Sequence, residues 1–211
     1  MKHRDPRRAG PLVFRDPVLL CGALYVLLYF DASGFLRLGL LAAFLHEWGH
    51  ILLYCAFFHR FPVIEVTMTG FCMRLSGDSL SPGRRFWLAA AGPAVNFALA
   101  GLWALRLGRN MTIRGSAFLA ANLLTGGFNL LPIPPLDGSR ALYLVAALLF
   151  GPAVGDAAAA VTGLACALAL VGTGIYIAAE TGGGALFLLA ALALLFGTLP
   201  QLRLAKRMRK V

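Results

Sequence analysis

Charged residues are scarce in this chain of 211 residues. They account for 13% of it and apolar residues for 59%, whereas ordinary soluble domains carry about 25% charged residues. A folded soluble protein could not cover its surface with so little polar material. The high apolar content also excludes intrinsic disorder. We therefore predict an integral membrane protein.

Acidic residues are the scarcer charge: nine Asp and Glu stand against 19 Lys and Arg, for a net charge of +10. In a soluble protein this excess would suggest nucleic acid as a partner. Here the basic residues gather at the two ends, as they do at the cytoplasmic flanks of membrane spans, so the expected partner is the lipid bilayer and not nucleic acid. The two basic ends contain Lys2, Arg4, Arg7, Arg8 and Arg15, and Arg203, Lys206, Arg207, Arg209 and Lys210.

Paired cysteines and a secretory leader are also missing. The four cysteines form no CxxC pair, so neither a disulfide framework nor a cysteine zinc site is expected. No small-residue cleavage site follows the first apolar run, so we expect no cleavable signal peptide.

The chain does contain long apolar runs, and a membrane span takes about 20 apolar residues. They predict an all-α polytopic membrane protein with about six transmembrane helices, at 17–30, 35–58, 85–105, 116–136, 157–179 and 182–200. The first run is short for a span. The stretch 136–150 either extends the fourth span beyond a proline break or lies at the membrane interface.

An even number of spans places both basic ends on one side of the membrane, which we expect to be the cytoplasmic side of a bacterial cell membrane. The loop arginines Arg106, Arg109 and Arg114 oppose this topology, because it places their loop outside. The predicted parts are a cytoplasmic tail at 1–16, a transmembrane domain at 17–200 with its core at 35–150, and a cytoplasmic tail at 201–211.

A short β-hairpin is expected after the second span. In the segment 62–76, Glu65, Thr67 and Thr69 alternate with apolar residues, which is the period of a strand. Gly70 can turn the chain into a second strand at 71–75. An ordinary loop is the alternative interpretation.

The second expected span carries the sequence HEWGH, in which His46 and His50 are four residues apart. On a helix these positions lie on one face, so both imidazoles can bind one zinc ion. Glu47 projects about 100° further around the helix and can act as general base on a water at the metal. Each ionisable residue at the bilayer centre costs about 2.5–3.5 kcal/mol. Three of them in five positions therefore favour a bound cation over a chance match.

A catalytic zinc keeps three protein ligands and one open position, so a third ligand is expected. The candidates are Glu65, Asp156, Glu180, His59 and Asp137. Asp137 follows three prolines that break the helix, and broken backbone at membrane depth is tolerated only inside protein or around a cavity. Asp137 is thus either a ligand inside the bundle or simply the cap of a helix that starts at Gly138.

Three motifs occur in order along the chain: HEWGH at 46–50, GPAVN at 92–96 and FNLLPIPPLDG at 128–138. Their order and spacing resemble the site-2 protease family of intramembrane zinc metalloproteases. The resemblance implies that His46, His50 and Asp137 bind Zn²⁺ and that Glu47 is the general base.

The resemblance also places two asparagines near the site, and it implies that Asn129 donates to the developing oxyanion. The residues alone leave two roles open for Asn96, an interhelical hydrogen bond or a role in the active site. Gly92 is expected to permit close helix packing. The predicted hairpin is similar to the family's membrane-associated β element, which is thought to hold an unwound substrate as an added strand.

The six spans and basic ends are most similar to the stage IV sporulation protein FB branch, which cleaves a sigma-factor precursor during sporulation. No PDZ domain is inserted, which argues against the stress-response branch. The C-terminal CBS domain of that sporulation branch is not present up to Val211. We therefore expect its regulation to be absent or supplied by a regulatory membrane partner.

The predicted function is hydrolysis of a peptide bond in or next to a transmembrane segment of a membrane-protein substrate that arrives laterally from the bilayer. The expected substrates are sigma-factor precursors or anti-sigma factors. The alternative is a non-catalytic metal-binding scaffold or carrier on the same fold, because a fold alone does not establish activity. A generic transporter would need polar residues along several spans, and the sequence has one cluster instead.

Overall fold

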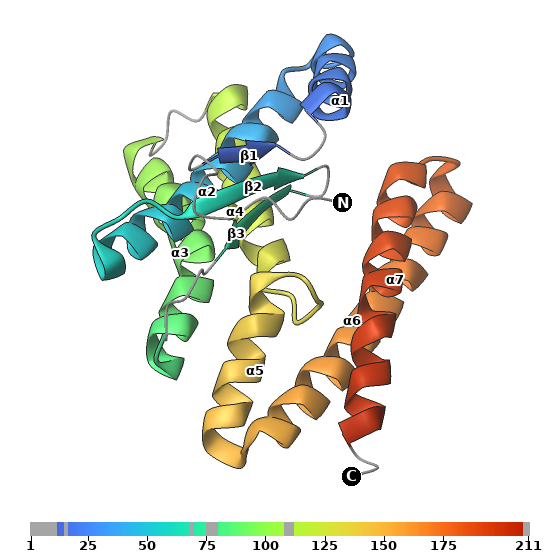
Figure 1. Ribbon diagram of the computed structural model, residues 1–211. Helices are drawn as coiled ribbons and strands as arrows, with labels where there is room; N and C mark the ends of the chain where they lie inside the picture. The colour runs from blue at the N-terminus through green and yellow to red at the C-terminus, as the bar shows by residue number, and fades with distance from the viewer. Residues whose placement is uncertain (1–11, 15–16, 68–69, 75–79, 108–111, 209–211) are drawn as a thin grey trace. The chain divides into compact units, whose positions relative to one another are not determined.

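The computed structural model describes residues 12–14, 17–67, 70–74, 80–107 and 112–208. Its elements follow in the order β1 (Leu12–Phe14), α1 (Pro17–Tyr29), α2 (Phe35–Phe58), β2 (Val63–Thr67), β3 (Gly70–Arg74), α3 (Pro82–Leu107), α4 (Ile113–Asn129), α5 (Asp137–Phe150), α6 (Pro152–Thr181) and α7 (Ala185–Met208) (Figure 1). Helices dominate, and the predicted all-α membrane fold with one small β element is confirmed.

Helices α2, α3 and α6 are long and apolar enough to cross a membrane. The qualifying stretches are Phe35–Phe58, Pro82–Arg106 and Pro152–Thr181, while α7 contains a shorter apolar stretch, Ala185–Thr198. These are the helices in the described part of the chain that meet a full span length, and the count of six spans stays a prediction.

The chain divides into two compact units. The first comprises Met1–Leu80 and Ala91–Gly126, and the second comprises Ser81–Ala90 and Gly127–Val211. Helix α3 begins in the second unit and continues into the first.

A small sheet of order β1-β2-β3 belongs to the first unit (Figure 1). Strands β2 and β3 are antiparallel, with Val63 opposite Arg74 and Thr67 opposite Gly70, so the predicted hairpin is confirmed. Ile64 and Val66 are buried on one side of β2, as the alternating pattern requires.

Strand β1 was not expected from the sequence. Its three residues pair in parallel with β2, Leu12 opposite Ile64 and Phe14 opposite Val66, in a stretch expected to be a tail. The rest of the predicted tail, at 1–11 and 15–16, lies outside the described residues, and so do 209–211.

Helix α2 begins at a capping cluster built on Asp31. Its carboxylate oxygens accept the backbone N–H groups of Leu36 at 3.4 Å and Arg37 at 3.1 Å. The hydroxyl of Ser33 donates to the same carboxylate at 3.1 Å, and the Arg37 guanidinium lies 3.5 Å from it. These contacts satisfy N–H groups that the first turn of a helix leaves without partners, which fixes where α2 starts.

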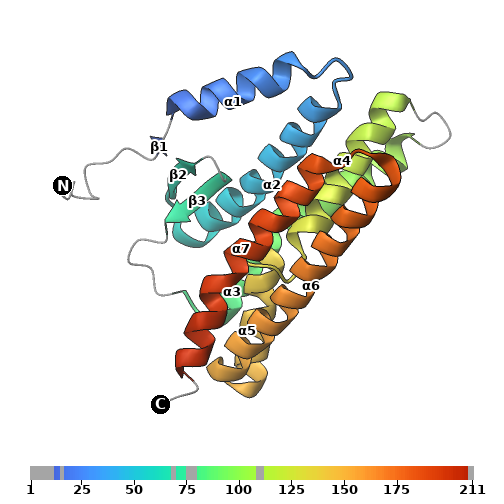
Figure 2. The same cartoon turned by 90° about the vertical axis from the view of Figure 1, so that its right-hand side faces the viewer.

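In the second unit, α6 packs along both α5 and α7 (Figure 2). Glycines permit the close approach: a Cβ at Gly155 would lie 2.9 Å from the Tyr143 carbonyl of α5, and one at Gly174 would lie 3.1 Å from Leu188 of α7.

The expected fourth span, 116–136, is not one helix. Helix α4 ends at Asn129 and α5 begins at Asp137. Pro132, Pro134 and Pro135 lie between them, and proline lacks the N–H that continued helix needs. The proline break is therefore confirmed, and 137–150 forms a helix of its own.

Candidate metal site

Two buried imidazoles converge on the interior face of α2. His46 and His50 have exposed fractions of 3% and 9%, and their Nε2 atoms are 3.2 Å apart. Two nitrogens bound to one tetrahedral zinc at about 2.0–2.1 Å would be about 3.3 Å apart. The spacing of the pair therefore fits a shared zinc ion.

Gly92 of α3 keeps the space beside these nitrogens open. A Cβ at this position would overlap Nε2 of His50 and lie 2.6 Å from Nε2 of His46. Any larger residue would thus fill the space in which the imidazole nitrogens converge. Gly92 does permit close packing, as predicted, and what it packs against is the histidine pair itself.

Asn96 lies one helical turn beyond Gly92 and is fully buried. Its Oδ1 is 2.7 Å from Nδ1 of His46, and its Nδ2 donates to the Ala42 carbonyl and to Oδ1 of Asn122, both at 3.0 Å. Asn96 therefore makes interhelical hydrogen bonds, one of them to His46. A role for Asn96 in the active site stays a prediction.

Asn122 of α4 was missed in the sequence because it belongs to none of the three motifs. It is fully buried, and its Nδ2 donates to the Phe118 carbonyl at 3.0 Å. An asparagine within a mostly apolar run is itself a signal, because a polar group buried there needs partners.

Asp137 is the first residue of α5 and is buried. The N-cap residue of this helix is Leu136, so the alternative in which Asp137 caps a helix that starts at Gly138 is wrong. Arg140, one turn on, lies 3.8 Å from its carboxylate. Gly138 lets the start of α5 approach the end of α4, because a Cβ there would overlap the carbonyl of Leu130.

Glycine contacts also position the proline segment from α6. A Cβ at Gly163 would lie 2.9 Å from the Pro132 carbonyl and 2.9 Å from Cδ of Pro134. The backbone that leads into Asp137 is thus held by close packing within the second unit.

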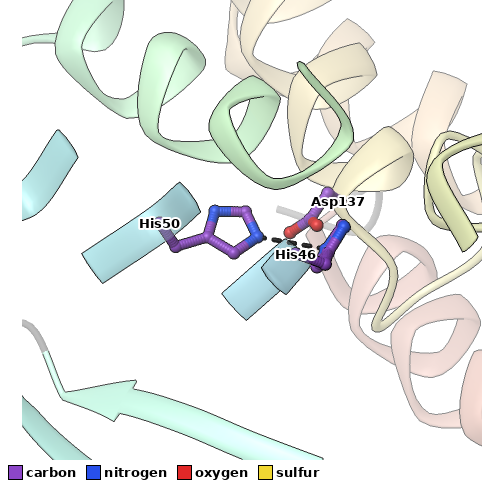
Figure 3. Close-up of side chains that lie close together, drawn as sticks. All are labelled: His46, His50 and Asp137. Carbon is purple, nitrogen blue, oxygen red and sulfur yellow. Dashed lines mark hydrogen bonds between the residues drawn. The ribbon is translucent and has the colours of Figure 1, made fainter. Parts of the chain in front are cut away.

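The ligand atoms of His46, His50 and Asp137 all lie within 4.8 Å of one another (Figure 3). Among the described residues, this is the one group of three or more His, Cys, Asp or Glu side chains that could hold a metal ion. The other candidates for a third ligand lie elsewhere: Glu65 on β2, Asp156 and Glu180 on α6, and His59 as the left-handed C-cap of α2.

The two predicted catalytic residues both lie on helices. Glu47 directly follows His46 on α2, and Asn129 is the last residue of α4, ahead of the prolines at 132, 134 and 135. Both are partly buried. Their roles in catalysis stay predictions.

No protein-family model matches the sequence, and no curated protein matches it. Among solved structures, the chain is similar to the site-2 protease from Methanocaldococcus jannaschii, with 22% sequence identity and a TM-score of 0.60. The match covers 88% of this chain and 85% of that chain. The chain therefore has the fold of a site-2 protease.

Proposed function

We propose that this protein is an intramembrane zinc endopeptidase. The observation that carries the proposal is the convergence of two buried imidazole nitrogens on a helix long and apolar enough to span a membrane, within a site-2 protease fold. His46, His50 and Asp137 would hold the zinc ion. When bound, zinc polarises a water molecule and the substrate carbonyl.

Glu47 supplies the proton transfers in this proposal. Its carboxylate takes a proton from the attacking water as the new C–O bond forms, and then passes that proton to the leaving amine nitrogen as the peptide C–N bond breaks. The side-chain amide of Asn129 donates a hydrogen bond to the oxygen on which negative charge develops.

The substrate is proposed to be a transmembrane segment that arrives laterally and unwinds. A helix hides its carbonyl groups in its own hydrogen bonds, so unwinding has to precede attack. The sheet β1-β2-β3 can hold an unwound strand by backbone pairing. Cleavage of a sigma-factor precursor or anti-sigma factor, as in the stage IV sporulation protein FB branch, remains part of the proposal.

The second candidate is a non-catalytic metal-binding scaffold or carrier on the same fold. It would use the same three ligands, which the geometry of the histidine pair supports equally. Glu47 discriminates between the two, because a carrier has no use for a base beside its ligands.

Glu47→Gln tests the proposal in a co-expression assay with a membrane-bound substrate. Removal of a general base lowers the rate by about 10²–10⁴-fold, so we expect cleavage to fall by that factor while zinc stays bound. Glu180→Gln is the matched control, because it makes the same change at an exposed position on α6 and should leave cleavage intact. Undiminished cleavage by Glu47→Gln would exclude the proposed base.

A further inference from the structure

A row of hydrogen bonds runs from His46 on α2, through Asn96 on α3, to Asn122 on α4, all within the first unit. The His46 Nδ1 to Asn96 Oδ1 distance is 2.7 Å, and the Asn96 Nδ2 to Asn122 Oδ1 distance is 3.0 Å. Both asparagines have an exposed fraction of 0%. Such a buried polar row needs every member to be matched with a partner.

Two main-chain carbonyls fix the direction of the row. A carbonyl can only accept, so the Phe118 carbonyl requires the amide nitrogen of Asn122 on its side. The oxygen of Asn122 then faces Asn96. The Ala42 carbonyl is a second acceptor beside it. Together the two acceptors hold the nitrogen of Asn96 on their side and leave its oxygen facing His46.

The orientation of Asn96 determines which ring nitrogen of His46 carries the proton. An amide oxygen can only accept, so the proton must sit on Nδ1 of His46. The lone pair of the neutral imidazole is then on Nε2, which is the atom that lies 3.2 Å from Nε2 of His50. This is the tautomer in which His46 can bind a metal through Nε2.

We propose that Asn122 is a positioning residue for the metal site: it orients the Asn96 amide and thereby holds His46 as the Nδ1–H tautomer. The inference rests on the proposed function, because the tautomer matters for zinc binding at His46. The tautomer itself is a property of the metal-free protein. If Asn96 were reversed, its oxygen would face the Ala42 carbonyl and the Asn122 oxygen, so that acceptor would meet acceptor at both contacts.

A purely structural role, in which Asn122 only ties α4 to α3, makes a different prediction. A structural tie would affect stability without changing the imidazole. The proton position on His46 therefore separates the two roles.

The test compares Asn122→Leu with Asn122→Asp in the full-length protein. Leucine removes the acceptor that faces Asn96. An uncharged aspartic acid keeps it and can donate its O–H to the Phe118 carbonyl, and burial favours this neutral form. Thr162→Val is the matched control, because it removes another side-chain bond to a carbonyl four residues earlier, on α6.

Two readouts are measured in each variant. The first is the ¹⁵N spectrum of the histidine rings in chelator-treated, metal-free protein, with His46 assigned by His46→Ala. The second is zinc affinity by competition with a chelating dye. Loss of an outer partner of a ligating histidine typically weakens metal binding about 10–100-fold. Because Asn122 acts through Asn96, we expect about tenfold weakening for Asn122→Leu.

We expect wild type, Asn122→Asp and Thr162→Val to show the Nδ1–H form of His46, and Asn122→Leu to show a mixture of tautomers with weaker zinc binding. The proposal is overturned if Asn122→Leu keeps both the tautomer and the affinity, whatever its stability. It is equally overturned if Asn122→Asp weakens zinc binding as much as Asn122→Leu does. Should wild type bind no zinc, the proposed function fails, and the metal-free spectra still decide the role of Asn122.

Discussion

Individual residues of the site differ in how visible they are in the sequence. His46, Glu47 and His50 were predicted because their relation is local: three side chains on one helix share a fixed geometry. Asp137 stood out through the prolines before it. The Gly92 contact with the imidazoles and the position of Asn122 depend on how α3 and α4 approach α2, and no local pattern encodes that approach.

Gly92→Ala tests the space beside the histidine pair. The added methyl would overlap Nε2 of His50, so we expect zinc binding to be lost and stability to fall by about 1–3 kcal/mol, the usual cost of overpacking. Metal content and the unfolding midpoint in detergent measure both effects.

Gly101→Ala is the control for this change. It lies on the same helix, and a Cβ there would meet nothing within 4 Å. The control should keep its zinc. If Gly92→Ala bound zinc as well as Gly101→Ala does, the ion would not occupy the space that Gly92 leaves open.

At the scale of elements, helices were predicted well and their connections less well. The bounds 35–58 agree with α2 because an apolar run and a capping segment coincide there. The run 116–136 is mostly apolar, yet its prolines divide it. Strand β1 has three residues and exists through pairing with β2, some fifty residues further along, so nothing in its own sequence marks it.

Asp31→Asn tests the start of α2 through its dependence on pH. Burial by itself would raise the pKa of Asp31, but the backbone N–H groups of Arg37 and Leu36 and the Ser33 hydroxyl lower that pKa below its ordinary value of 3.8. The charged form is thus favoured in the folded state. Its stabilisation is complete above the unfolded-state pKa and is lost as the pH falls through the lower folded-state pKa.

We therefore expect wild type to have a higher unfolding midpoint than Asp31→Asn at pH 7, and the difference to shrink as the pH falls below about 4. Thermal unfolding in detergent across pH 3–7 measures this. A difference that grew as the solution became more acidic would contradict the capping role of the carboxylate.

At the scale of the whole molecule, composition established the class of protein before any motif was considered. The small charged fraction required a membrane, and the similarity to a solved site-2 protease agrees with that prediction. Substrate, orientation and number of spans depend on partners and on the bilayer, so they are set by interactions that no single span encodes.

Metal content is the most direct test of the central claim. We expect purified wild-type protein to contain one zinc ion per chain by elemental analysis, and His46→Ala and Asp137→Ala to contain little, because a site that loses one of three protein ligands binds far more weakly. Glu180→Gln should match wild type. A wild-type protein without a bound divalent metal, or an Asp137→Ala protein that keeps its full zinc content, would contradict the account.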